Sequence, residues 1–264
     1  MFARKTAWRG LALLLACALA SFFPAIAGTA RADNPNSSGI SDEASAALAR
    51  MGKTLLAKQF AFQARTLRSY AGPNGELLHI AHTIKTVYRR PDRLATDVTG
   101  DDGSVKLVYD GKAVVLYGAE QKQYASIPIT GSIDQALNAV EERTGTDFPL
   151  ADLLSEDPGE SVLAGVVLGG QVGTSTIDGV RCRHLFFVQA PDMEFELWLE
   201  DNERSLPRRF VVTYRSLPGR PIFIAEISNW DFSIQAPDSE FEFQPPVGVA
   251  KVDLPSSAKP APPN

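Results

Sequence analysis

The side chains best suited to chemistry in this chain are the carboxylates of the stretch DMEFELWLED, residues 192–201. They are Asp192, Glu194, Glu196, Glu200 and Asp201. Alternate residues of a strand share a face, so the even-numbered carboxylates would lie about 7 Å apart, near the spacing of paired catalytic acids. The residues between them are Met193, Phe195, Leu197 and Leu199. Because these are apolar, the stretch also fits a strand with one buried and one solvated face, the interpretation that we adopt.

Histidine and cysteine offer no stronger pattern for catalysis or metal binding. His79 and His82 are three residues apart in an expected strand, which places them on opposite faces and prevents them from sharing a metal ion. Cys182 stands between Arg181 and Arg183, which could activate a thiol, but in a strand both arginines point away from it. We therefore expect a small buried thiol. The sequence contains neither a Gly-x-Ser-x-Gly elbow nor a Gly-rich phosphate loop. We expect no enzyme activity, no catalytic residue, no cofactor and no metal.

Most of the chain alternates between apolar and polar residues, the period typical of strands. Short Gly-bearing turns such as YDGK and LPGR separate the alternating stretches, which favours antiparallel hairpins in sequential order. A continuous antiparallel sheet of this size must twist, curl or close. The sequence predicts about eleven strands, at residues 59–70, 76–90, 93–99, 104–110, 113–118, 121–127, 171–177, 180–189, 193–201, 207–215 and 222–234.

Three segments have helical periodicity instead. Residues 41–57 carry an apolar stripe, residues 132–144 open with Ser132 and Gln135 as a capping box, and a shorter piece covers residues 150–154. Single helices inserted among strands exclude a doubly wound parallel sheet. Several strands are apolar on both faces. They are either central strands of an ordinary core or strands of a sheet whose concave side is covered by the helices, and we expect the second arrangement. The predicted fold is mainly β, of the α+β kind.

The first 32 residues have the three parts of a secretory signal peptide: a basic start, an apolar run at residues 11–23 and small residues before a cleavage site. The run is shorter than the ~20 residues that span a bilayer, so we expect cleavage before Asp33. Cys17 in LLAC could instead be acylated as in lipoproteins, but the residues after it stay apolar, which favours cleavage. The expected remainder is a flexible linker at 33–40, one domain at 41–254 and a disordered Pro/Ala-rich tail at 255–264.

The net charge of the chain argues against some classes of binding partner. Removing residues 1–32 takes away four basic residues and no acidic residue, which moves the formal net charge from −5 to −9. An acidic protein is repelled by nucleic acid and by anionic membranes, so we expect neither as a partner. Only Cys182 remains after cleavage, so no internal disulfide is expected. The fold must therefore depend on its hydrophobic core.

Several motifs resemble a known family. YRRPDRL at 88–94, YDGKAVVLYGAEQKQY at 109–124 and FEFQPPVGVAKVD at 241–253 are similar, in kind and order, to landmarks of the periplasmic lipoprotein carriers typified by LolA and LolB. The whole mature chain more closely resembles a family of predicted periplasmic proteins of the DUF2092 type with a LolA/LolB-like fold. The further landmarks for that family are FPLADLL, IDGVRCRHLFF, LWLE and LPRRFVVTY.

The resemblance implies a strongly curved, unclosed antiparallel β-barrel whose concave apolar side is covered by helices that act as a lid. In such carriers the arginine before the proline hydrogen-bonds to the lid and favours its closed state, and Arg90 occupies that position here. Pro91 ends strand pairing because it has no backbone donor, and Arg90 offers donors for helix-end carbonyls. The alternative is that Arg89 and Arg90 are a solvated pair at a strand end.

These observations predict a periplasmic protein without enzyme activity that binds an acyl chain, a lipid or a lipoprotein between sheet and lid, as a carrier or a sensor. The alternative is a cell-envelope interaction module with a filled core, no ligand and a protein partner. We further expect a monomer with no stable membrane span after signal cleavage. The residues predicted on the cavity side are Leu78, Ile80, Ile84, Val114, Leu116, Leu137, Val140, Val212 and Ile224, with Arg90 as the lid latch.

Overall fold

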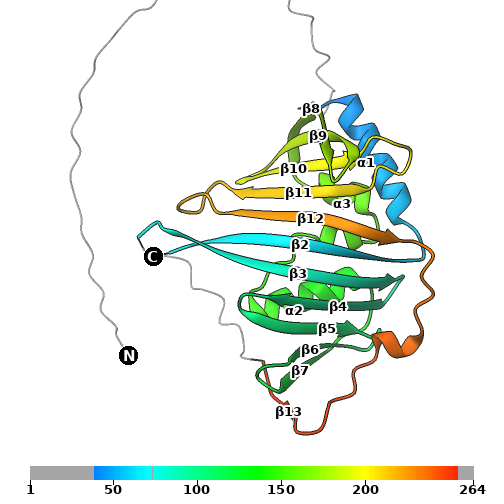
Figure 1. Ribbon diagram of the computed structural model, residues 1–264, viewed down its shortest axis with the longest axis vertical. Coiled ribbons are helices and arrows are strands. Elements are labelled where there is room, and N and C mark those ends of the chain that lie inside the picture. Colours follow the sequence, from blue (N-terminus) through cyan, green and yellow to red (C-terminus); the bar gives the residue numbers. More distant parts are fainter. Residues whose placement is uncertain (1–38, 73, 255–264) are drawn as a thin grey trace, which may run out of the picture. The chain divides into compact units, whose positions relative to one another are not determined.

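Thirteen strands of one sheet form the framework of the protein (Figure 1). A computed structural model describes residues 39–72 and 74–254, so the predicted signal peptide, most of the linker and the tail lie outside the described residues. The strands are β1 (Gly39–Ile40), β2 (Gln59–Ala71), β3 (Leu77–Arg89), β4 (Arg93–Gly100), β5 (Gly103–Tyr109), β6 (Ala113–Gly118), β7 (Gln123–Pro128), β8 (Val166–Ile177), β9 (Val180–Gln189), β10 (Met193–Glu200), β11 (Pro207–Tyr214), β12 (Ile222–Asp231) and β13 (Ala250–Lys251). The helical elements are α1 (Asp42–Leu55), α2 (Ile133–Thr144), the 3-10 helix η1 (Ala151–Leu154), α3 (Pro158–Leu163) and the 3-10 helix η2 (Asp238–Phe241).

The strand order is β1-β8-β9-β10-β11-β12-β2-β3-β4-β5-β6-β7-β13. Two antiparallel meanders, β8 to β12 and β2 to β7, are joined where β12 pairs with β2. The short strands β1 and β13 pair in parallel with β8 and β7 at the two edges. The predicted unclosed, curved, mainly antiparallel sheet is confirmed, and all eleven predicted strands are present within a few residues of their expected ends.

The sequence did not predict β1, β13 and α3. Two-residue strands are too short for a period, and Gly39–Ile40 falls inside the expected linker. The six-residue α3 is also too short for a helical period, although Asp157 caps its first turn by accepting a hydrogen bond from the backbone N–H of Glu160. The strand β8 begins at Val166, five residues before the predicted start, because its glycines and exposed apolar residues hide the alternation.

The helices α1, α2 and α3 and the 3-10 helix η1 lie against one face of the sheet, which we call the inner face (Figure 1). The helix α1 begins at the Ser41 cap and buries Ala44, Leu48, Met51 and Leu55. Its backbone comes so close to α3 that an added Cβ on Gly52 would lie 2.9 Å from the backbone nitrogen of Gly159. The helix α2 begins with the predicted capping box, in which Ser132 and Gln135 satisfy each other's backbone donors.

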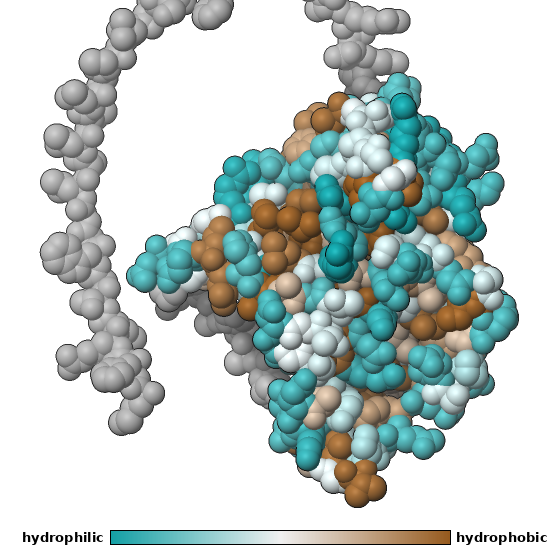
Figure 2. Space-filling view, in the orientation of Figure 1, coloured by the Kyte–Doolittle hydropathy of each residue, from teal (hydrophilic) through white to brown (hydrophobic). Residues whose placement is uncertain are grey.

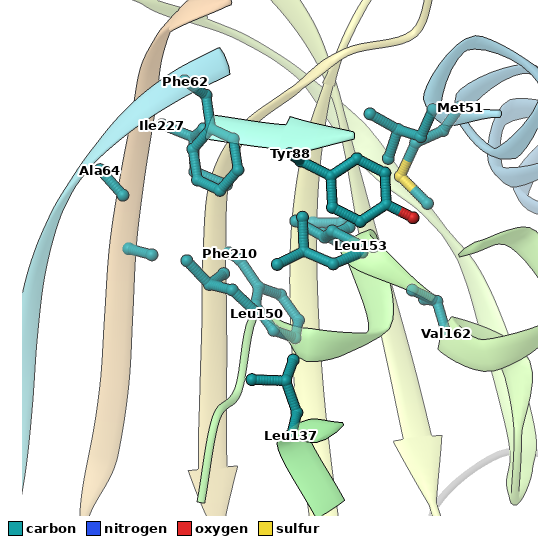
Figure 3. Close-up of a cluster of buried hydrophobic side chains, with 14 of the residues drawn as sticks. Met51, Phe62, Ala64, Tyr88, Leu137, Leu150, Leu153, Val162, Phe210 and Ile227 are labelled. Carbon is teal, nitrogen blue, oxygen red and sulfur yellow. The ribbon is translucent and has the colours of Figure 1, made fainter. Parts of the chain in front are cut away.

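Side chains from all these helical segments meet the sheet in one apolar cluster. In Figure 3, Met51 of α1 and Leu153 of η1 surround Tyr88, while Leu150 lies beside Phe210. Tyr88 and Leu153 are fully buried, so this cluster holds the helices against the inner face of the sheet. It fills the space over β8 to β12 with the chain's own side chains.

The other face of the sheet, the outer face, carries the segment that leads to η2. Arg89 donates a hydrogen bond of 3.1 Å to the backbone oxygen of Ala236, forms an ion pair with Asp238 and lies 4.7 Å above the ring of Phe241. Phe241 and Ala236 form a second small core with Ala95. The carboxyl-terminal segment therefore packs across the outer face before β13 joins the edge.

The close approach of α1 and α3 leads to a stability prediction. Alanine normally stabilises a helix relative to glycine by about 1 kcal/mol. Gly52→Ala should instead destabilise the protein by about 1–3 kcal/mol, because the new methyl group would push against the backbone of Gly159. Urea unfolding measures the effect. Gly173→Ala is the matched control, since nothing lies within 4 Å of its added Cβ. A Gly52→Ala protein more stable than the wild type would contradict this packing.

Candidate ligand-binding site

A cavity of about 630 Å³ lies between the inner face of β2 to β7 and the segment formed by α2, η1 and the loop between them. We call this segment, residues 133–154, the lid. Apolar side chains dominate the walls, and the lid contributes Leu137, Val140, Leu150 and Leu154. The opposite walls come from the strands, with Phe62, Ile84, Leu94, Leu107 and Leu116. Such a volume and lining are typical of small-molecule sites.

The cavity is open to solvent at one end of the sheet. At the turns β2–β3, β4–β5 and β6–β7 its lining residues are exposed, among them Tyr70, Asp102 and Gln121. At the opposite strand ends, Phe60, Tyr88 and Tyr109 are buried. A ligand would therefore enter along the strands from the end that holds these three turns, which we call the mouth.

Four of the nine predicted cavity residues line the cavity: Ile84, Leu116, Leu137 and Val140. Val114 and Val212 point to the inner face but are buried in the packed core beyond the cavity. Leu78 and Ile80 occupy the same face of β3 as Ile84, closer to the turn and outside the mouth. Strand alternation therefore placed six of these residues on the inner side, and the helical stripe of residues 132–144 placed Leu137 and Val140 there, but neither period located the empty space.

Ile224 is a correction, because it lies on the outer face. Its neighbours Phe223 and Ala225 are buried on the inner face, and Phe223 lines the cavity. Three apolar residues in succession, Ile222 to Ile224, left the register of β12 open in the sequence. A shift of one residue exchanges the two faces of a strand, which explains the wrong placement.

Arg90 reaches the ends of two helical elements. Its guanidinium donates hydrogen bonds to the backbone oxygens of Leu55 at 3.1 Å and Ser155 at 2.9 Å, with a longer contact of 3.4 Å to Glu156. Leu55 ends α1, and Ser155 follows η1. The guanidinium also lies 5.2 Å above the Tyr88 ring. Arg90 therefore ties the sheet to α1 and to the end of the lid, at the closed end of the cavity.

A second connection, which sequence reasoning missed, fastens the lid at the mouth. Arg68 of β2 forms a two-pronged ion pair with Asp147, in the loop after α2, and the hydroxyl of Tyr214 donates a 2.9 Å hydrogen bond to the same carboxylate. Arg68 and Asp147 both line the cavity. The available signal was Arg68 itself, because a cation on the inward face of a half-buried strand requires a partner.

The charges of this connection shift the ionisation of its members. Burial by itself would raise the pKa of Asp147, but the hydrogen bonds and charge of Arg68, with the Tyr214 hydroxyl, hold the pKa below its usual value. Burial, followed by the negative charge of Asp147, raises the pKa of Tyr214 far above its ordinary range. Asp147 is therefore a carboxylate and Tyr214 a neutral hydrogen-bond donor at neutral pH.

The groups first considered for chemistry do not meet in the cavity. In β10 the side chains of Phe195, Leu197 and Leu199 are buried, as the strand interpretation of DMEFELWLED predicts. Glu196 instead contacts His184 at 2.5 Å, and burial raises the pKa of the Cys182 thiol, which is the predicted buried cysteine. In the part of the chain that the structure describes, no three His, Cys, Asp or Glu side chains are grouped to hold a metal ion.

Comparison with known proteins identifies the family. Residues 44–255 match the family described as "Predicted periplasmic protein (DUF2092)". The chain belongs to this family. None of the described helices is both long and apolar enough to cross a membrane. A search of curated proteins gives no match.

Solved structures with a similar fold share little sequence with this family member. An uncharacterized conserved protein from Thermus thermophilus has 11% identity and a TM-score of 0.48, covering 80% of this chain and 99% of its own. The lipoprotein LppX from Mycobacterium tuberculosis has 16% identity and a TM-score of 0.46, covering 74% and 99%. A LolA superfamily protein from Nitrosomonas europaea has 11% identity and a TM-score of 0.37, covering 75% and 96%. The ligand of this family member must therefore be argued from its own cavity.

The contacts of Arg90 lead to a prediction about lid motion. Arg90→Leu should speed amide exchange in residues 145–163, because the carbonyls of Leu55, Ser155 and Glu156 lose their donor while the core stays intact. Hydrogen-exchange mass spectrometry measures this change. Arg89→Leu is the matched control and should speed exchange only near residues 234–242, on the outer face. Unchanged exchange of residues 145–163 in the Arg90 variant would disprove the role as a latch.

The Arg68–Asp147 ion pair predicts a pH dependence. Because the pKa of Asp147 is lower in the folded protein than in the unfolded chain, its stabilisation is present above about pH 4 and is lost as the pH falls through the folded value. Asp147→Asn should therefore lose less unfolding free energy between neutral pH and roughly pH 3 than the wild type does. Urea titrations across this range test the difference. Glu43→Gln, which removes an exposed carboxylate of α1, should behave like the wild type.

Proposed function

We propose that the protein binds the acyl chain of a lipid or lipoprotein in the cavity under the lid and acts in the periplasm as a carrier or sensor without catalysing a reaction. The cavity carries this proposal. Its walls are mostly apolar, and the polar residues Arg68, Asp102 and Asp147 lie toward the mouth. An amphiphile would place its chain along the strands and leave its head group in the mouth.

The energetics of such binding are favourable. Each methylene removed from water contributes about 0.8 kcal/mol, so a chain that enters even partly provides several kcal/mol before the cost of moving the lid. No charged anchor is needed inside. Among the described residues Arg68 is the only Lys or Arg in the lining, and its guanidinium is already paired with Asp147. Charge therefore favours a cargo that is held by its apolar part.

The interaction-module alternative requires a filled inner face, and only half of the inner face meets that requirement. Over β8 to β12 the space is occupied by α1, α3 and side chains such as Phe187 and Phe195. Over β2 to β7 the lid leaves about 630 Å³. This open half favours ligand binding as the proposed function.

Two measurements test ligand binding. The first is native mass spectrometry of protein purified from its own periplasm, followed by solvent extraction, and the second is the affinity for a fluorescent fatty acid. We expect apolar adducts on the wild type. Leu116→Trp should reduce bound adduct and the affinity for a fluorescent fatty acid by about tenfold or more, because the indole occupies cavity volume that a chain would use.

Tyr117→Trp provides the matched control on the same strand. Tyr117 points to the outer face, where its ring centre lies 5.3 Å from that of Phe243. The same new side chain should therefore leave ligand binding unchanged. Wild-type protein without adducts and without affinity for the fluorescent probe would overturn the proposal.

A further inference from the structure

Several large apolar side chains are exposed at the mouth end of the sheet. The turns β2–β3 and β11–β12 project together at this end (Figure 1), and an added Cβ on Gly219 would lie 3.1 Å from Leu77. Leu78 is 60% exposed, Leu217 49% and Tyr70 45%. In Figure 2 hydrophobic residues adjoin the tips that project on the left. We call Tyr70, Leu77, Leu78 and Leu217 the apolar tip.

The apolar tip continues into the cavity. Tyr70 and Leu78 are directly opposite each other in the β2–β3 ladder, and both face the inner side. Tyr70 also lines the cavity, while Ile80 follows Leu78 on the same face of β3 and leads to Ile84 inside. The predicted residues Leu78, which is exposed, and Ile80, which is half-buried, therefore extend the cavity wall beyond the mouth.

We propose that the apolar tip docks on the surface of a lipid bilayer and delivers the mouth of the cavity to the acyl chains there. This inference rests on the proposed function. A chain that leaves a bilayer for the cavity would otherwise cross water, at a cost that grows with every methylene. Leu78, Ile80 and Tyr70 give it apolar contact as far as the mouth. There two polar pairs line the cavity, Arg68 with Asp147 and His82 with Asp102.

The charges around the tip specify how it meets the bilayer. Arg215 and Arg220 both pair with Glu194, at 3.5 and 3.2 Å, so the base of the tip is not repelled by phosphate groups. The chain as a whole is acidic, which disfavours adsorption by charge alone. Docking therefore depends on shallow insertion of leucine and tyrosine side chains, for which tyrosine is suited because its ring is amphipathic. A bilayer of zwitterionic lipids meets these conditions.

Flotation with phosphatidylcholine vesicles tests the proposal. The wild type should float with the vesicles at both low and high salt, since insertion is not screened. Leu78→Ser and Leu217→Ser should each lower the partition coefficient about tenfold, because each removes one inserted side chain. The matched control is Leu168→Ser with Val172→Ser on β8, where the exposed fractions are 53% and 62%. This variant should float like the wild type.

Two further measurements separate the possible failures. Leu78→Trp should show fluorescence that shifts to the blue on vesicles and is quenched by brominated lipid. The affinity of the Leu217 variant for the fluorescent fatty acid, measured without vesicles, should equal that of the wild type. Wild-type protein that binds the fatty acid but does not float, or a β8 control that loses flotation equally, overturns membrane docking. Flotation without fatty-acid binding would instead overturn the proposed function.

Discussion

The inner face of a large curved sheet must be removed from water, and only a few helical turns are available to cover it. One half of the inner face is covered by close packing. The backbones of α1 and α3 approach each other at Gly52 and Gly159, and the two helices fill the space over β8 to β12. The other half is covered by the lid, and Val252 and Leu254 of the carboxyl-terminal segment also line the cavity. The helix α2 has twelve residues and is only about 18 Å long, shorter than the roughly 24 Å across six strands, so it leaves part of the space over them unfilled. The cavity is the consequence of this unequal coverage.

Polar contacts at both ends hold the lid in place. At the closed end Arg90 donates to the oxygens of Leu55 and Ser155, and at the mouth Arg68 holds Asp147. Each contact gives a hydrogen-bond partner to polar groups that would otherwise lack one. Its loss should therefore destabilise the lid at that end. The apolar packing beneath the lid is incomplete, because the cavity lies between the lid and the sheet. Directional bonds therefore decide the position of the lid more than they would in a filled core.

The adjacent arginines of YRRPDRL show why neighbours in sequence need not share a role. Arg89 is the last residue of β3 and points to the outer face, where it holds Ala236 and Phe241. Arg90 points to the inner face and holds the helices. Alternation along an extended chain explains this division, and Pro91 ends the strand because it has no backbone donor. One short motif thereby attaches separate segments to both faces of the same sheet.

The candidate site was only partly predictable. Clean alternation placed Ile84 and Leu116 correctly, whereas the run Ile222 to Ile224 carried no information on register and Ile224 was assigned to the wrong face. Asp147 was missed because it follows a helix in a loop, far in sequence from Arg68 and Tyr214. Pairing between such distant residues depends on how two meanders are joined. The local alternation of apolar and polar residues gives no information on contacts between residues so far apart in the sequence.

Sequence alone determined the strands, the capped helices, the sense of the hairpins and the inner or outer direction of most side chains, because these follow from periods of two and 3.6 residues and from turn chemistry. It also contains neither a Gly-x-Ser-x-Gly elbow nor a Gly-rich phosphate loop. Only the tertiary structure decided that half of the inner face is filled and half is hollow, and that the open end of the hollow coincides with the exposed leucines. Both depend on the curvature of the whole sheet and on the fixed length of α2, which are properties of the assembled chain.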